Sequence, residues 1–184
     1  MNLIPNYKNK IKSEKFKISF SFESIDPYFY LEPLLFLSDE YSQIRSAEDA
    51  VGSDFRISTC QGVIFNRQKN TFLLDLNRLD TDIKCITLVL SPPPNYQFRT
   101  LTDYFVDIES LDTPSEKFYA PSCCNGSDKL SDFVMVFKFV RYARHSGWYV
   151  EGLSRYFCGD SDYLYRLFGC KDYFPYPIYN LNMV

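Results

Sequence analysis

The 184-residue chain carries 20 lysines and arginines against 23 aspartates and glutamates, and this net charge of −3 argues against a nucleic-acid-binding surface. A hydrophobic content of 46% excludes wholesale disorder, and the length predicts a single domain over residues 1–184. Aromatic residues make up 18% of the chain, which favours β-strands because flat rings pack well on a pleated surface.

The first segment is a basic N-terminal arm, residues 1–15, whose lysine cluster extends to Lys17. We expect a solvated arm that runs into a strand edge. The arm lacks the apolar segment of a secretory signal, and no apolar run of the chain approaches the ~20 residues of a membrane span. The expected location is therefore cytoplasmic, where cysteines remain reduced thiols. The six cysteines are Cys60, Cys85, Cys123, Cys124, Cys158 and Cys170.

The first strand is predicted over residues 17–22, because Ile18, Phe20 and Phe22 alternate there with polar side chains. An aromatic and acidic connection follows, bounded by Pro27 and Pro33. Further strands are predicted over residues 34–37, 63–65, 72–76, 83–90 and 104–108.

A long β-hairpin is predicted over residues 133–157, with its loop at the five residues ARHSG. The first strand of this hairpin is expected to place Met135, Phe137 and Phe139 on one face. Trp148 is expected to begin the returning strand and to pin the hairpin to the core.

A short helix is predicted after the hairpin, capped by Asp160 or Ser161 and ended by Gly169. The apolar face of this helix consists of Leu164, Leu167 and Phe168. The remaining residues, 171–184, form an aromatic, proline-bearing tail that either caps the core or contributes to an interface. About eight strands and little helix predict a mainly β fold, a β-sandwich of two antiparallel sheets with one or two short helices.

Catalytic arrangements are weak in this sequence. His145, the only histidine, is adjacent to Ser146 in the hairpin loop, where neighbouring side chains diverge, and no GxSxG motif is present. The vicinal pair Cys123 and Cys124 has no second pair that would complete a metal site, and small turn residues are the simpler interpretation. No glycine-rich phosphate loop occurs. We therefore expect a protein that is not an enzyme.

The remaining candidates for a functional site are carboxylates, which can act as metal ligands. Glu23, Asp26 and Glu32 surround the proline-bounded connection, and Asp75 lies in a predicted strand. Calcium prefers six to eight oxygen ligands from such groups and from backbone carbonyls. The chain lacks the alternating aspartates and glycines of a dense calcium loop, so residue chemistry alone predicts solvated loop charges.

The order and spacing of several segments resemble the tellurium-resistance (TerD-type) stress protein family. Residues 135–137 (MVF), 145–148 (HSGW) and 165–169 (YRLFG) are similar to that family's C-terminal strand, tryptophan-bearing strand and final helix. Residues 72–91 are similar to its central pair of strands, and residues 34–46 to an earlier motif. The resemblance covers roughly residues 16–169 and implies a TerD-like β-sandwich.

The resemblance implies two calcium-binding loops, and this chain departs from the family at both. At the first loop only Glu32 keeps a carboxylate. At the second, residues 60–71 contain no acidic residue and instead contain Arg67 and Lys69. Cations so close to a dication site would oppose binding. Calcium is therefore expected to bind weakly or not at all. The candidate ligands are Glu23, Asp26, Glu32 and Asp75.

The sequence and the resemblance together lead to a first functional hypothesis. The chain is a non-enzymatic, TerD-like stress or tellurite-resistance protein that acts by binding other proteins, including other components of such systems. A second hypothesis is a calcium-responsive module with one weak site at Glu23, Asp26 and Glu32. A third is a β-sandwich that binds a small molecule in an aromatic cleft.

Overall fold

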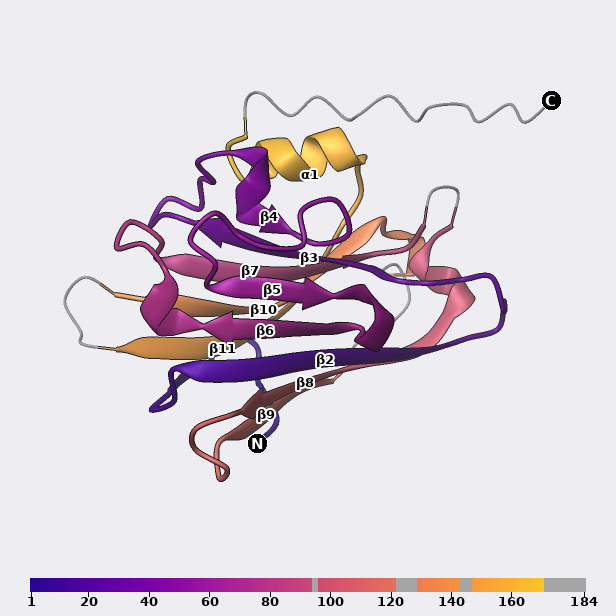
Figure 1. Cartoon of the computed structure of the whole chain (residues 1–184). Helices are drawn as coiled ribbons and strands as arrows, with labels where there is room; N and C mark the ends of the chain where they lie inside the picture. The colour runs from indigo at the N-terminus through magenta and orange to yellow at the C-terminus, as the bar shows by residue number, and fades with distance from the viewer. Residues whose placement is uncertain (94–95, 122–128, 143–146, 171–184) are drawn as a thin grey trace.

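A computed structural model of the chain describes residues 1–93, 96–121, 129–142 and 147–170. These residues form two antiparallel sheets that stack face to face (Figure 1). The six-stranded sheet has the order β1-β11-β10-β7-β3-β4, and the five-stranded sheet has the order β5-β6-β2-β8-β9. The predicted β-sandwich is confirmed.

The six-stranded sheet consists of β1 (Lys8–Lys10), β3 (Glu32–Ser38), β4 (Ala50–Val51), β7 (Cys85–Ser91), β10 (Phe133–Arg141) and β11 (Trp148–Phe157). The five-stranded sheet consists of β2 (Lys15–Ser24), β5 (Val63–Asn66), β6 (Thr71–Asp75), β8 (Leu101–Ser110) and β9 (Lys117–Pro121). Among the described residues the helices are η1 (Ala47–Asp49), η2 (Arg67–Lys69), η3 (Leu76–Arg78), η4 (Phe98–Thr100) and α1 (Ser161–Leu167).

The main core lies between the two sheets and is built from strand alternation. In β2, Phe16 and Ile18 are fully buried, whereas Lys15 is exposed and Lys17 is only partly buried. The ring of Phe16 packs against that of Phe139 across the core, with centroids 5.3 Å apart. Such contacts remove large apolar areas from water, and this burial is the main force that holds the sheets together.

A β-bulge changes which face one predicted core residue occupies. The register of β10 shifts between Met135 and Phe137 against both of its neighbouring strands. An extra residue in a strand reverses the facing of everything beyond it, because side chains alternate with a period of two. Phe137 and Phe139 therefore enter the main core, while Met135 packs in a second cluster on the outer face of the six-stranded sheet. The prediction of one common face was wrong for Met135.

The helix α1 covers part of that outer face, above β3 and β4 in Figure 1. Asp160 is its cap, since its side chain accepts a hydrogen bond of 2.7 Å from the Tyr163 backbone N–H. The ring of Phe168 stacks on Phe36 of β3 with centroids 4.0 Å apart. Leu164 is buried as predicted, but Leu167 is 39% exposed, so the predicted apolar face was too wide.

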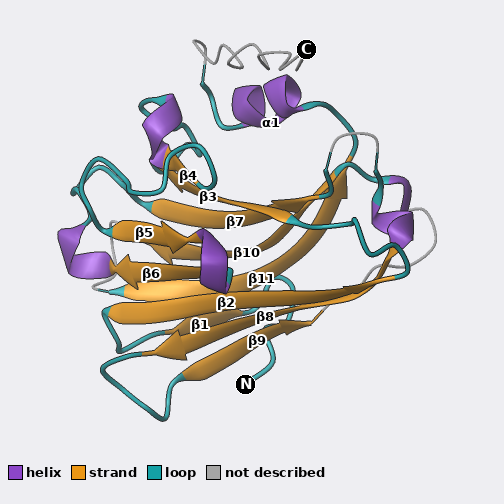
Figure 2. Cartoon of the chain, turned by 45° about the vertical axis from the view of Figure 1, so that its right-hand side comes forward, coloured by secondary structure: helices purple, strands orange, loops and turns teal. Residues whose placement is uncertain are grey.

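The N-terminal segment belongs to the sandwich and is not a solvated arm. Leu3 and Ile11 are buried, and the Leu3 N–H donates a hydrogen bond of 2.7 Å to the carbonyl of Tyr119 in β9. Further along, the Asn6 N–H donates to the carbonyl of Gly152 in β11 at 3.3 Å. The segment thus joins the edges of both sheets, and Figure 2 shows the N-terminus beside β9.

The hairpin is formed as predicted, with Trp148 as the first residue of β11. Its indole is 8% exposed and lies 5.2 Å from the Arg141 guanidinium, in cation–π geometry. His145, Ser146, the Cys123–Cys124 pair and the tail of residues 171–184 lie outside the described residues. None of the helices described has the length and apolar content required to cross a membrane.

An ion network joins three connections at one end of the sandwich. The carboxylate of Asp49, in η1, is fully buried. Arg45 donates to it from Nε at 2.8 Å and from Nη2 at 3.0 Å. The Nη1 atom of Arg45 lies 2.6 Å from Asp80 and 3.3 Å from Asp82, both in the connection between β6 and β7. The same guanidinium reaches Thr59, in the connection between β4 and β5, at 3.3 Å.

We expect Arg45→Met to lower the free energy of unfolding by about 3 kcal/mol, because it leaves the buried Asp49 carboxylate without its cation. The matched control is Arg166→Met, whose partner Asp162 is 44% exposed; losing this surface pair should change stability by less than about 1 kcal/mol. Urea denaturation measures both. Equal effects of the two substitutions would contradict the structural role assigned to Arg45.

Candidate functional site

A cleft opens at one end of the sandwich, where β3 begins and the β5–β6 turn ends. Its volume is about 190 Å³. We call it the end cleft. Its lining consists of Phe22, Tyr30, Leu31, Glu32, Pro33, Ser53, Phe65, Arg67 and Asn70. It contains both Glu32, the one carboxylate kept at the first loop that the resemblance implies, and Arg67, a cation at the second.

The β5–β6 turn places Arg67 at the cleft. Arg67 begins η2, and the side chain of Asn66 caps this short helix by accepting a hydrogen bond of 3.1 Å from the Lys69 N–H. Asn70 then adopts a left-handed conformation with φ of 47°, which asparagine tolerates better than most residues, and returns the chain into β6. The sequence NRQKN therefore forms a compact turn that presents a cation.

Glu32 is the first residue of β3 and is only partly exposed. Burial raises the pKa of its carboxyl above the ordinary value, the nearby charge of Asp54 adds to this increase, and the charge of Arg67 opposes it. Burial, together with the charge of Glu32, also raises the pKa of the Tyr30 hydroxyl at the rim of the cleft. A half-buried carboxylate and an arginine thus share one small space.

Two of the other predicted calcium ligands are engaged in local structure. Asp26 accepts a hydrogen bond of 2.8 Å from the Tyr28 N–H and one of 3.1 Å from the Tyr96 hydroxyl. Asp75 accepts from the Asn77 N–H at 3.2 Å, and its other oxygen lies 3.6 Å from the Lys15 ammonium. These carboxylates shape turns and pair across strands.

Glu23, the remaining predicted ligand, lies on the exposed face of the five-stranded sheet. It is directly opposite Asp103 in the register of β2 and β8. Like charges in opposite positions of a strand pair repel each other. Among the residues described, neither carboxylate forms an ion pair. The pair therefore leaves an unbalanced negative charge at the surface.

These positions do not fit a calcium ion. Calcium requires six to eight oxygens converging on one point. Within the described parts of the chain, no three His, Cys, Asp or Glu side chains gather where they could hold a metal. The predicted ligands Glu23, Asp26, Glu32 and Asp75 are therefore not brought together, and the end cleft holds a guanidinium beside its carboxylate.

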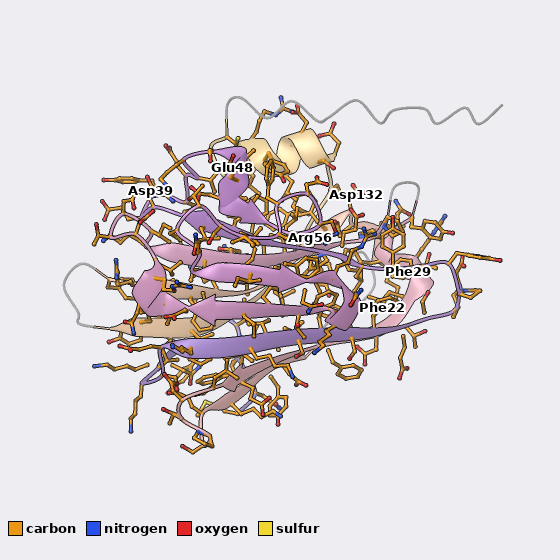
Figure 3. The ribbon with its side chains drawn as sticks, viewed as in Figure 1. Phe22, Phe29, Asp39, Glu48, Arg56 and Asp132 are labelled. Atoms are coloured by element: carbon orange, nitrogen blue, oxygen red, sulfur yellow. The ribbon has the colours of Figure 1, made fainter. Side chains whose placement is uncertain are left out.

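The connection between β2 and β3 presents apolar side chains to solvent beside the end cleft. We call residues 25–30 the aromatic loop. Phe29 anchors it, being 4% exposed, with its ring centroid 5.8 Å from that of Phe22 and 5.8 Å from that of Tyr96. Figure 3 shows Phe22 and Phe29 next to each other at this end of the sandwich. Ile25 and Tyr28 are 80% and 82% exposed.

Sequence reasoning recognised the aromatic character of this connection but not which side chains would be exposed. The signal was present in the run DPYFY, because five adjacent positions cannot all turn inward from a connection bounded by prolines. Which ring is buried was decided by Phe22 and Tyr96, and Tyr96 is about seventy positions away in the sequence.

Comparison with known proteins identifies the fold. No protein-family model matches the chain, and no curated protein matches its sequence. A solved structure described as the unknown-function protein SAV2460 superposes with a TM-score of 0.64 at 18% identity, over 86% of this chain and 98% of that chain. A homologue of the telluride resistance protein TerD, SCO6318 from Streptomyces coelicolor A3(2), superposes with a TM-score of 0.62 at 12% identity, over 84% and 96% respectively. The chain therefore has a TerD-like β-sandwich fold.

We expect Glu32→Gln to raise the melting temperature at neutral pH. The folded protein holds the Glu32 proton more tightly than the unfolded chain, because the pKa of this carboxyl is raised above 4.5 in the fold. Stability is therefore lost as the pH rises from 4.5 through the raised pKa, and the amide avoids this loss.

The advantage of the variant should shrink below pH 4.5, where Glu32 is protonated in both states. Thermal unfolding from about pH 3 to about pH 8 measures this difference. Glu48→Gln, at an exposed glutamate outside the cleft, is the control. A Glu32→Gln effect independent of pH would mean that packing, and not ionisation, is responsible.

Proposed function

We propose that this chain is a non-enzymatic interaction module that binds a protein partner through the aromatic loop. The observation that carries the proposal is the exposure of Ile25 and Tyr28 on a loop anchored by buried Phe29. Large apolar side chains held in water by a rigid base are typical of interaction surfaces, where they become the central contacts of a complex. The anchor lowers the entropy lost on binding, since the loop is already ordered.

The surface beside the aromatic loop defines the chemistry of the partner. Glu23 lies at the end of β2, immediately before the loop, and faces Asp103 across the strand pair. A lysine or arginine on the partner would relieve this repulsion and add charge-assisted hydrogen bonds. The proposed partner is therefore a protein with an apolar patch beside a basic side chain. Because a homologue of the telluride resistance protein TerD has the same fold, we place the proposed partner in a resistance system of this kind.

The module is proposed to work without calcium. Arg67 supplies a positive charge to the end cleft, where it opposes the charge of Glu32. Arg67 thus supplies the positive charge that a bound calcium ion would otherwise supply, and it repels a calcium ion that approaches the cleft. At about 190 Å³ the end cleft is also smaller than the ~300–1,000 Å³ typical of small-molecule sites, so it favours a protein-binding role over a ligand-binding one.

We expect the double substitution Ile25→Ser and Tyr28→Ser to abolish retention of the partner by the immobilised chain. Because both side chains are exposed, the folding free energy should change by no more than about 0.5 kcal/mol. Tyr41→Ser is the matched control, since Tyr41 is 75% exposed on a different connection. Glu23→Lys should also weaken retention, and added salt should weaken it for the wild type.

Quantitative affinity capture from an extract of the source cells compares these variants with the wild type. Retention that is equal for the wild type and the double variant, with the same bound proteins identified in both, would remove the aromatic loop from the proposal. Loss of retention in the Tyr41→Ser control would indicate non-specific adhesion of exposed aromatics.

We expect the melting temperature to be the same in excess calcium and in chelator. A native site at about 100 times its dissociation constant would add about 2.7 kcal/mol to the free energy of unfolding. A calcium-dependent increase that disappears in the Glu23→Gln and Glu32→Gln double variant would instead support the calcium-responsive module. An increase that survives in this variant would place calcium at other residues.

A further inference from the structure

The N-terminal segment, residues 2–11, docks on the sandwich through partners that come much later in the chain. Leu3 bonds to Tyr119 of β9, as described above, and the Ile11 N–H donates a hydrogen bond of 3.1 Å to the carbonyl of Trp148 in β11. Between these two points, β1 pairs with residues 149–151 of β11. These contacts depend on the segment itself and not on how it is joined to β2, so the segment of a second copy can make all of them.

The surface of β9 and β11 that receives the segment, which we call the seat, is shaped by a glycine. An isolated bridge between Pro5 and Gly152 brings the two backbones side by side. A Cβ atom placed on Gly152 would lie 3.2 Å from both the carbonyl carbon and the Cβ of Leu3, which is tighter than an ordinary contact. Leu3 is itself 3% exposed. The seat therefore fits this segment closely, and a branched side chain at position 152 would exclude it.

The connection between β1 and β2, residues 12–14, is bent by side chains from another part of the chain. It contains no glycine, proline or asparagine, and none of its three residues has a positive φ. Glu116, between β8 and β9, accepts hydrogen bonds of 2.9 Å from the Lys12 N–H and 2.8 Å from the Ser13 N–H. Asp112, in the same connection, accepts one of 3.1 Å from the Glu14 N–H. We call these two carboxylates the hinge clamp.

Release of the hinge clamp lets residues 12–14 extend. β1 lies in the six-stranded sheet and β2 in the five-stranded sheet, so the chain passes between the sheets at this connection. When the carboxylates let go, the three N–H groups bond to water and the segment can leave its own seat. Exchange of such an element between two copies costs little beyond the opening of the hinge, because every other contact is made again in the second copy.

We propose that two copies of this chain exchange their N-terminal segments and so form a dimer. In this dimer, residues 2–11 of each copy occupy the seat of the other copy, and residues 12–14 are extended between the two sandwiches. The closed monomer and the dimer share all contacts except those of the hinge, so protein concentration and the hinge clamp set the balance between them. The dimer presents two aromatic loops, but the exchange does not depend on the partner proposed above.

The experiment mixes two full-length variants. Leu3→Asp damages the segment and leaves the seat intact, whereas Gly152→Val damages the seat and leaves the segment intact. Each variant alone should stay monomeric at concentrations at which the mixture forms a heterodimer, joined by the one intact segment on the one intact seat. Size-exclusion chromatography with light scattering measures the mass after each sample, and the mixture, is refolded from urea.

Glu116→Ala tests the hinge clamp in the otherwise native chain. The dissociation constant of the dimer should fall at least about tenfold, because the closed hinge loses two hydrogen bonds to a charged acceptor that the extended hinge does not make. The matched control is Glu109→Ala in β8, whose carboxylate lies 3.8 Å from the Lys117 ammonium, and it should leave the dissociation constant unchanged. Equal effects of the two substitutions would remove the clamp from the proposal.

A mixture that stays monomeric while both variants are folded would overturn the proposal. So would a wild-type dimer that persists when Leu3→Asp and Gly152→Val are combined in one chain, because that dimer would use another surface. If either variant fails to fold, a disulfide decides the outcome. Asn2 and Tyr119 are bridge partners, so Asn2→Cys with Tyr119→Cys should join two chains in the dimer and close within one chain in the monomer.

Non-reducing electrophoresis separates these two products. A crosslinked dimer that grows with protein concentration, and that is absent with Asn2→Cys alone, supports the exchange. Disulfides confined to single chains, even in the most concentrated refolded sample, would overturn it.

Discussion

The ion pair between buried Asp49 and Arg45 fixes two of the places where the chain passes from one sheet to the other. The chain crosses from the six-stranded to the five-stranded sheet between β4 and β5, and it returns between β6 and β7. Arg45 contacts Thr59 in the first crossing and Asp80 in the second, while its main partner precedes β4. The β5–β6 hairpin lies between these two crossings. Its turn, with Arg67 at the end cleft, is therefore held at a fixed place relative to β3 by contacts at the other end of the hairpin.

Long strands were predictable from sequence because apolar and polar side chains alternate along them, and each residue's polarity indicates which face of the sheet it occupies. The pattern of β2 and of β8 is confirmed almost residue by residue. Of the four edge strands only β5 was predicted. The other three, β1, β4 and β9, contain two to five residues and owe their conformation to a neighbouring strand. The bulge in β10 was missed for a related reason, since Met135 and Phe137 have the right composition for one face and only the register of two other strands separates them.

The candidate site was likewise predictable only in part. The presence of a cation near residue 67, where the resemblance implies acidic residues, was visible in sequence, and the structure brings Arg67 and Glu32 to one cleft. It was harder to predict from sequence that the candidate calcium ligands would lie apart. Asp26 and Asp75 each accept from a backbone N–H two residues further on, which is a local preference of aspartate. Their second partners, Tyr96 and Lys15, come from distant parts of the chain and could not be inferred.

The N-terminal segment that joins the two sheet edges also determines the order in which the protein can be completed during synthesis. Leu3 pairs with Tyr119 and Asn6 with Gly152, so the residues made first have partners made more than a hundred residues later. Until β9 and β11 leave the ribosome, the N-terminal residues have no strands to join. Closure of this side is therefore a late event in folding. During that interval, open strand edges expose the nascent chain to pairing with its neighbours.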